Sequence, residues 1–293
     1  MDIAVLSDIH GNGIALQACM EYLKKHPVDA YCFLGGYVGE FRGIRRVMDT
    51  LYELQENFPC YMLRGNKEGY MLSGMGEAHP EWDSYPSTVG MLRYGRAHLT
   101  RQDLSFMDSL PTTACIHIDG MKDIRICHGT QRAVNEKMRP QNRENQEILA
   151  GVEEEYMLCG HTHKVMSIQE YSKTIWNPGS VGLPIIEEGA MKAQFMVLHG
   201  DDGAWHPEFV ELDYDIERTI QDMHENGLRE VAPYWTRVTE RILRGTRVTH
   251  GGVLGRAMEL CTQETGGCNW PEVPEIYWKR AFEETDVRSD KST

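Results

Sequence analysis

The sequence has no long apolar run and no basic, apolar leader at its N-terminus. A bilayer-spanning helix needs about 20 consecutive apolar residues, and a signal peptide begins with positive charge before a short apolar core. We therefore expect neither a signal peptide nor a membrane partner. The 8 cysteines are scattered without a Cys-x-x-Cys pair, and most stand in apolar stretches, which favours buried, reduced thiols. These absences predict a cytoplasmic protein.

Positive charge is also scarce. The chain carries 30 Lys and Arg against 44 Asp and Glu, a formal net charge of −14. Affinity for nucleic acid depends on cationic surface, so nucleic acid is not an expected partner. A small phosphate ester is not excluded, because a metal site offsets its charge locally. The sequence contains neither a phosphate-binding P-loop nor a Ser/His/Asp arrangement for nucleophilic catalysis.

The sequence does contain a succession of strands, loops and helices. Buried strands are predicted at 2–6, 31–34 and 60–63, and helical periodicity follows the first two at 14–25 and about 43–55. Such units are typical of α/β architecture. Further strands are expected at 113–118, 123–127, 156–158, 165–169, 173–176, 194–199 and 208–212.

The length of 293 residues suits one large globular domain with an appendage. We expect a core at 1–212, interrupted by a polar insertion at 74–110 that covers the site as a lid. From 213 to 293 the pattern becomes helical. It predicts a C-terminal extension that packs on the core or joins a second copy of the chain as a homo-oligomer.

Two short stretches place metal-ligating side chains one residue apart. His161 and His163 follow an apolar run and a glycine, and Asp8 and His10 follow the first predicted strand. In extended backbone such pairs point to the same side, with Cα atoms roughly 6.5–7 Å apart. This spacing suits two metal ions roughly 3.5–4 Å apart. A surface histidine pair, and an Asx-type turn with Asn12 as helix cap, fit the same residues.

These motifs, taken together and in order, resemble the calcineurin-like metallophosphoesterases. The resemblance covers about residues 1–212 and rests on Ser-Asp-Ile-His-Gly-Asn at 7–12, Gly-Asn-Lys-Glu at 65–68, Cys-His-Gly at 127–129, Gly-His-Thr-His at 160–163 and Asn-Pro-Gly-Ser at 177–180. It implies a four-layer αββα sandwich with the site on loops at the strand ends. Within the family the chain is most similar to a bacterial branch of small phosphodiesterases and diadenosine-polyphosphate hydrolases.

The resemblance also implies roles for individual residues. Asp8, His10 and His163 match ligands of a first metal, and Asn66, His128 and His161 match ligands of a second. Nitrogen and carboxylate ligands suit Mn, Fe or Zn. Two such ions activate a bridging water for attack on a small phosphate mono- or diester, such as a nucleotide or dinucleoside polyphosphate. Asn66, His128 and Lys67 would serve catalysis, and Glu68 and Asn12 would support the ligands from a second shell.

Two positions depart from the family pattern. Gly36 stands where the family has an aspartate that bridges both metals, so double occupancy is expected to weaken. We do not expect Glu40, four residues on, to replace it. Lys67 stands where many members have a histidine, and either contacts a phosphoryl oxygen or is an exposed lysine beside Glu68. The alternative to an active enzyme is therefore an impaired member that binds metal and inorganic phosphate without useful turnover, with one or two ions bound.

Overall fold

A computed structural model of the protein describes residues 1–74, 79–186 and 189–289. The chain forms two compact units. The core unit contains Met1–Leu72, Leu99–Ile185 and Lys192–Asp215, and the helical unit contains Ser73–His98, Ile186–Met191 and Ile216–Thr293.

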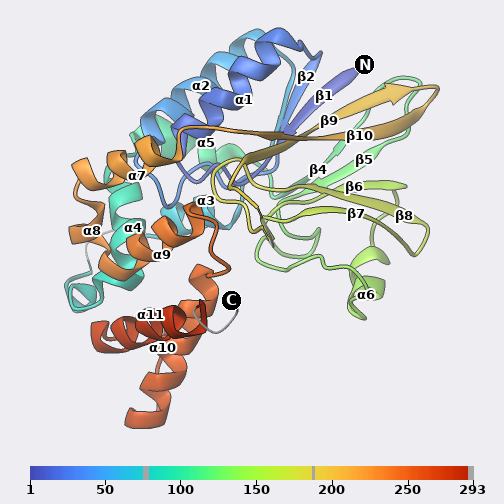
Figure 1. Ribbon diagram of the computed structural model, residues 1–293. Coiled ribbons are helices and arrows are strands. Elements are labelled where there is room, and N and C mark those ends of the chain that lie inside the picture. The colour runs from blue at the N-terminus through green and yellow to red at the C-terminus, as the bar shows by residue number, and fades with distance from the viewer. Residues whose placement is uncertain (75–78, 187–188, 290–293) are drawn as a thin grey trace. The chain divides into compact units, whose positions relative to one another are not determined.

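The strands of the core unit form two sheets of five strands each (Figure 1). They are β1 (Asp2–Leu6), β2 (Ala30–Phe33), β3 (Cys60–Met62), β4 (Thr113–Ile116), β5 (Ile124–Cys127), β6 (Tyr156–Leu158), β7 (Val165–Glu170), β8 (Lys173–Pro178), β9 (Ala193–Asp201) and β10 (Ala204–Leu212). The sheet orders are β10-β9-β1-β2-β3 and β4-β5-β6-β8-β7. Within them β1, β2 and β3 run parallel, as do β5, β6 and β8. Parallel strands end at the same edge of a sheet, which is where ligands bind in open α/β folds.

The two sheets enclose one apolar core. Strand β1 contributes Ile3 and Val5 to it, and the second sheet contributes Ile126 and Leu158, all fully buried. The two residues of β1 are two positions apart, so both point to the same face of their sheet. The residues between them are buried on the other face, under the helices, which explains why these short strands are apolar throughout.

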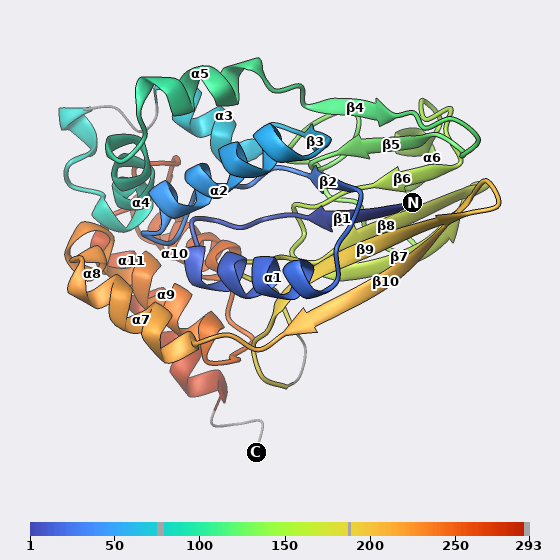
Figure 2. The same ribbon diagram turned by 90° about the horizontal axis from the view of Figure 1, so that it is seen from above.

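Helices cover the outer faces of the sheets. Figures 1 and 2 show α1 (Gly13–Lys25) and α2 (Ile44–Asn57) over the first sheet. The buried residues of α2 recur every three or four positions and form one stripe: Ile44, Val47, Met48, Leu51 and Leu54. On the second sheet, α6 (Asn145–Leu149) contributes Ile148 and Leu149 to a cluster with Met157 and Ile175. The expected αββα sandwich is confirmed, with a thinner helical layer on the second sheet.

Two further helices of the core unit are α3 (Asn66–Leu72) and α5 (Arg101–Ser109). The helical unit contains the 3-10 helix η1 (Pro80–Trp82), α4 (Pro86–Ala97), α7 (Ile216–Glu225), α8 (Leu228–Val231), α9 (Pro233–Leu243), α10 (His250–Thr265) and α11 (Glu275–Ser289). Buried Trp278 on α11 donates to Oγ1 of Thr88 on α4 at 2.9 Å. Glu275 accepts from the main chain and hydroxyl of Ser87.

The expected insertion at 74–110 is divided between the two units. Its first part clusters with the C-terminal helices, and the part from Leu99 onward belongs to the core unit. Residues 75–78 of the insertion lie outside the described residues. The compact units therefore have boundaries other than 212/213, and a role of this insertion as a lid stays a prediction. Within the described ranges, no helix combines the length and apolar character needed to cross a bilayer.

Candidate metal centre

Asp8 and His10 lie in the loop that leads from β1 to α1. Both have left-handed backbone, with φ of 54° and 56°, a conformation that is strained for residues other than glycine. The main-chain N–H of Asp8 donates to the carbonyl of Gly35 at 3.0 Å, and that of His10 donates to Gly36 at 2.8 Å. These main-chain hydrogen bonds thus fix the loop after β1 against the loop after β2. As a result Oδ1 of Asp8 lies 3.5 Å from Nε2 of His10.

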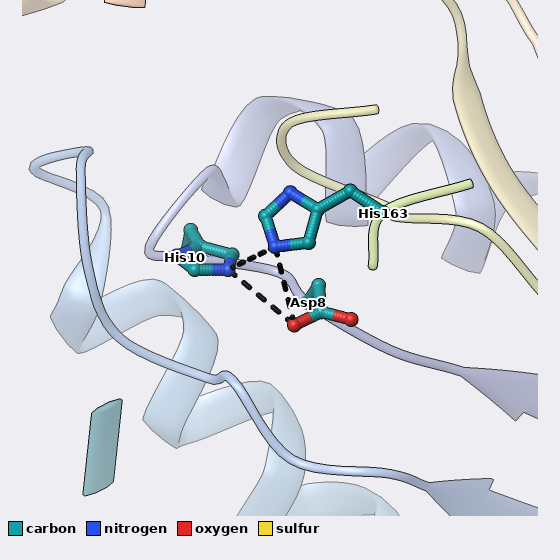
Figure 3. Close-up of side chains that lie close together, drawn as sticks. All are labelled: Asp8, His10 and His163. Atoms are coloured by element: carbon teal, nitrogen blue, oxygen red, sulfur yellow. Dashed lines mark hydrogen bonds and ion pairs between the residues drawn. The ribbon is translucent and has the colours of Figure 1, made fainter. Parts of the chain in front are cut away.

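His163 reaches the same point from the loop after β6. Its Nε2 lies 3.1 Å from Nε2 of His10 and 3.4 Å from Oδ1 of Asp8 (Figure 3). These three donor atoms all lie within 4.8 Å of one another. Two donors that each sit about 2.0–2.2 Å from one ion are about 3–3.5 Å apart when they subtend roughly 90–110° at it. The observed spacings fit that requirement, so the three residues can hold one metal ion.

Three histidines at the site each have a hydrogen-bond partner at Nδ1: His10, His128 and His163. Nδ1 of His163 lies 2.7 Å from the carbonyl of Leu183, and Nδ1 of His128 lies 2.7 Å from that of Leu34. Nδ1 of His10 lies 2.5 Å from Oε2 of Glu40. Metal-ligating histidines typically donate their other N–H in this way, which fixes the ring and its tautomer. All three rings therefore present Nε2 to the site.

The other expected ligand set is assembled in part. Oδ1 of Asn66, at the start of α3, lies 2.9 Å from Nε2 of His128, which follows β5. The ring of His161 is 5.3 Å from that of His128 between centroids. Its Nε2, however, lies 3.2 Å from the carbonyl of Asn135. The structure brings Asn66 and His128 together and places Nε2 of His161 beside a main-chain oxygen.

Burial and neighbouring charges shift the pKa values of Asp8 and His10 in opposite directions. Burial alone would raise the pKa of Asp8, but His163 and His128 outweigh it and hold the pKa well below its usual range. Burial disfavours a charged His10, yet Glu40 and Asp8 raise its pKa to about 9. For His161, burial and then the neighbouring His128 lower the pKa to about 4. The site thus favours one anionic carboxylate surrounded by imidazole rings.

The sequence matches the calcineurin-like phosphoesterase superfamily domain over residues 1–203, more than two thirds of the chain. The chain belongs to this family. The cluster of Asp8, His10 and His163 lies on the loops where the resemblance of the sequence placed the family's metal site.

The chain is also similar to individual proteins in sequence or in fold. An uncharacterized protein of Methanocaldococcus jannaschii is 26% identical over 242 residues, which cover 78% of this chain and 94% of the relative. A hypothetical protein from Pyrococcus horikoshii superposes with a TM-score of 0.68 at 23% identity, covering 80% of this chain and 97% of the other. A metallophosphoesterase from Sphaerobacter thermophilus gives 0.64 at 22% identity, covering 84% and 100%. The two solved structures support the fold.

Gly36, which the sequence resemblance aligns with the family's bridging aspartate, has φ of 75°. A Cβ atom at this residue would lie 2.8 Å from Oδ1 and 3.0 Å from Cα of Asp8. Such contacts are shorter than packed atoms tolerate. The carboxylate of Asp8 therefore lies too close to this position for a side chain at residue 36 to fit without a shift.

Glu68 holds the loops that carry these residues. Its Oε2 accepts from the main-chain N–H of Gly36 at 2.9 Å and of Gly65 at 2.8 Å, and its Oε1 accepts from Tyr37 at 2.8 Å. Glu68 is fully buried. The sequence predicted that Glu68 orients a neighbouring ligand from behind, without binding metal itself. Its hydrogen bonds fix the main chain beside Gly36 and Asn66.

Asn12 acts as the helix cap that the sequence offered as one alternative. Its side chain accepts from the N–H of Ala15 at 3.1 Å and donates to the carbonyl of Gly182 at 3.0 Å. The first bond satisfies an otherwise unpaired donor in the first turn of α1. The second ties that helix to the segment after β8. Asn12 thus stabilises the loop that carries His10.

Lys67 and Glu40 form a contact that the sequence analysis did not predict. Nζ of Lys67 lies 2.5 Å from Oε1 of Glu40, while the other oxygen of Glu40 lies on His10. Lys67 is thus neither an exposed lysine nor a partner of Glu68 in these contacts. The available signal was an acidic residue in the apolar, glycine-rich loop at 37–41. Its partner could not be named, because His10 is 30 positions away.

Proposed function

We propose that the chain is a metal-dependent phosphoesterase that hydrolyses a small phosphate mono- or diester. The observation that carries this proposal is the cluster of Asp8, His10 and His163, whose facing atoms are 3.1–3.5 Å apart. Such spacing among buried imidazole and carboxylate donors suits a divalent ion. The family assignment supports the same chemistry.

We assign the ligands in two sets. Asp8, His10 and His163 form the first, and Asn66, His128 and His161 form the second. Their nitrogen and oxygen donors suit Mn, Fe or Zn. Ions bound there would activate water as the nucleophile and neutralise charge on the phosphoryl oxygens.

The protein's own residues would position these donors and the substrate. Leu34, Leu183 and Glu40 fix the three histidine rings through Nδ1. Lys67 offers a cation beside the site, and we propose that it assists phosphoryl binding when it leaves Glu40. A nucleotide or a dinucleoside polyphosphate is a substrate of the proposed class. The acidic net charge of −14 favours such a small ester over a polymer.

Gly36 supports a second candidate, an impaired member that binds metal and phosphate without useful turnover. The site offers a single buried carboxylate, Asp8, among the facing atoms of the cluster. Two divalent ions repel each other, and fewer anions between them weaken double occupancy. A bound phosphate would then supply the missing negative charge.

Paired measurements decide between the candidates: bound metal per chain, and Mn²⁺-dependent hydrolysis of p-nitrophenyl phosphate and bis-p-nitrophenyl phosphate. We expect hydrolysis by the unchanged chain and its loss in His10→Ala and His163→Ala. Gly36→Asp adds the family carboxylate, and Gly36→Ala is its control because both add the crowding Cβ. Activity that appears only in Gly36→Asp would favour the impaired member. Hydrolysis by the unchanged chain that survives both histidine substitutions would refute the metal assignment.

A further inference from the structure

We infer that Asp8 is a ligand shared by both metal positions and takes the place of the missing carboxylate at residue 36. The inference rests on the metal site of the proposed function and deepens it. The family pattern assigns this aspartate to the first position alone.

One oxygen of Asp8 faces both ligand sets. Its Oδ1 lies 3.4 Å from Nε2 of His163 and 3.5 Å from Nε2 of His10, the two histidines of the first set. The same oxygen lies 3.9 Å from Nε2 of His128, which belongs to the second set. That nitrogen is in turn 2.9 Å from Oδ1 of Asn66. A single carboxylate oxygen thus connects the donors of the two sets.

The other oxygen of Asp8 is held by the protein. Oδ2 accepts from the hydroxyl of Ser7 at 2.7 Å and from the main-chain N–H of His161 at 2.9 Å. The carbonyl of Asp8 accepts from Ser180 at 2.7 Å. The two bonds to Oδ2 fix the rotation of the carboxylate, so Oδ1 stays directed at the histidines.

Gly36 makes room for this arrangement. The Cβ position of residue 36 lies 2.8 Å from Oδ1 of Asp8. A side chain there would displace the oxygen, since real side-chain atoms do not approach so closely. The observed position of Oδ1 is therefore compatible with glycine at residue 36 and crowded by any larger residue.

A shared Asp8 has a measurable consequence. A ligand of one position affects only the ion bound there, whereas a shared ligand affects both. Asp8→Asn should therefore abolish binding of both ions at the Mn²⁺ concentration that fills the unchanged chain, while His163→Ala and His128→Ala each retain about one ion.

The sharpest comparison uses His163→Ala, in which the second position holds the remaining ion. Calorimetric titration with Mn²⁺ gives its dissociation constant. Adding Asp8→Asn should weaken the binding of that ion by at least about tenfold. Adding the exposed Glu21→Gln instead keeps Asp8 and its contacts and should change the constant by less than about threefold. Equal constants in His163→Ala and Asp8→Asn/His163→Ala would overturn the inference.

A crystal structure of the unchanged chain with Mn²⁺, located by anomalous scattering, tests the same point if the variants unfold. We expect Oδ1 of Asp8 within roughly 2.0–2.6 Å of both ions. An oxygen bound to one ion only would refute the sharing. Neither readout depends on turnover, so an inactive protein with a shared Asp8 would refute the proposed function alone.

Discussion

Nδ1 of His10 and Oε2 of Glu40 are 2.5 Å apart, and both side chains are buried. The pair couples a carboxylate outside the metal cluster to one of its ligands. A carboxylate in this position fixes the imidazole and makes it a more basic ligand.

We expect Glu40→Gln to weaken Mn²⁺ binding about 10–100-fold, because outer partners of metal-bound histidines typically contribute this much. Glu40→Ala should weaken it further, since it also leaves space beside the ring. Titration calorimetry checks both constants. Glu21→Gln, on the exposed face of α1, is the matched control. Binding as tight in Glu40→Gln as in the control would exclude this role.

Lys67 compensates the charge of Glu40, and its loss should destabilise the fold. Glu40 is only 3% exposed. Without Lys67 its Oε1 loses the ammonium that contacts it, while Oε2 keeps its contact with His10. The loss of a charged hydrogen-bond partner is costly for a buried carboxylate. We expect Lys67→Met to lower the free energy of unfolding by about 1–3 kcal/mol. In Lys67→Met/Glu40→Gln the loss should be smaller than the sum of the single losses. Urea denaturation of the metal-free proteins completes the cycle, and additive losses would contradict the pairing.

Glu68 supports three main-chain N–H groups without contributing to the metal cluster. Glu68→Gln keeps the shape but replaces one acceptor oxygen with a donor, so an N–H group loses its partner. We expect it to lower the free energy of unfolding by about 1–3 kcal/mol, and Glu68→Ala by more. Urea denaturation measures both, with the exposed Glu56→Gln as control. A stability equal to that of the control would refute the structural role.

The helical unit contains a carboxylate that should make its stability depend on pH. Burial would raise the pKa of Glu240, but hydrogen bonds from Arg229 and His224 outweigh it and lower the pKa below its usual value. A carboxyl group whose pKa is lower in the folded than in the unfolded state stabilises the fold at pH values above its unfolded-state pKa, which is near 4.3. That contribution is lost as the pH falls through the folded-state pKa.

Glu240→Gln should therefore lower the melting temperature at pH 7, and the difference from the unchanged chain should shrink below about pH 4.3. Thermal unfolding followed by circular dichroism between pH 7 and pH 3 measures it. The surface variant Glu225→Gln, which loses only a pair with Arg218 and a bond from Gln221, should show a much smaller difference. A difference that grows on acidification would contradict the sign.

The sequence by itself determined the elements and the candidate ligands. Apolar runs such as 2–6 and the periodicity of about 43–55 are local patterns, and they correspond to β1 and α2. The pairs Asp8 with His10 and His161 with His163 likewise stand one residue apart in the chain. Each prediction needed only the geometry of a few consecutive residues.

Only the tertiary structure decided what these residues contact. His10 meets Glu40 across 30 positions, and Trp278 meets Thr88 across 190. Oδ1 of Asp8 lies 3.4 Å from Nε2 of His163, which is 155 residues further along the chain. It also lies close to Gly36, which has no side chain to displace it. Such contacts follow from how sheets and loops pack, which local periodicity does not encode. The sequence therefore named the candidate ligands, and the fold decided which carboxylate lies among them.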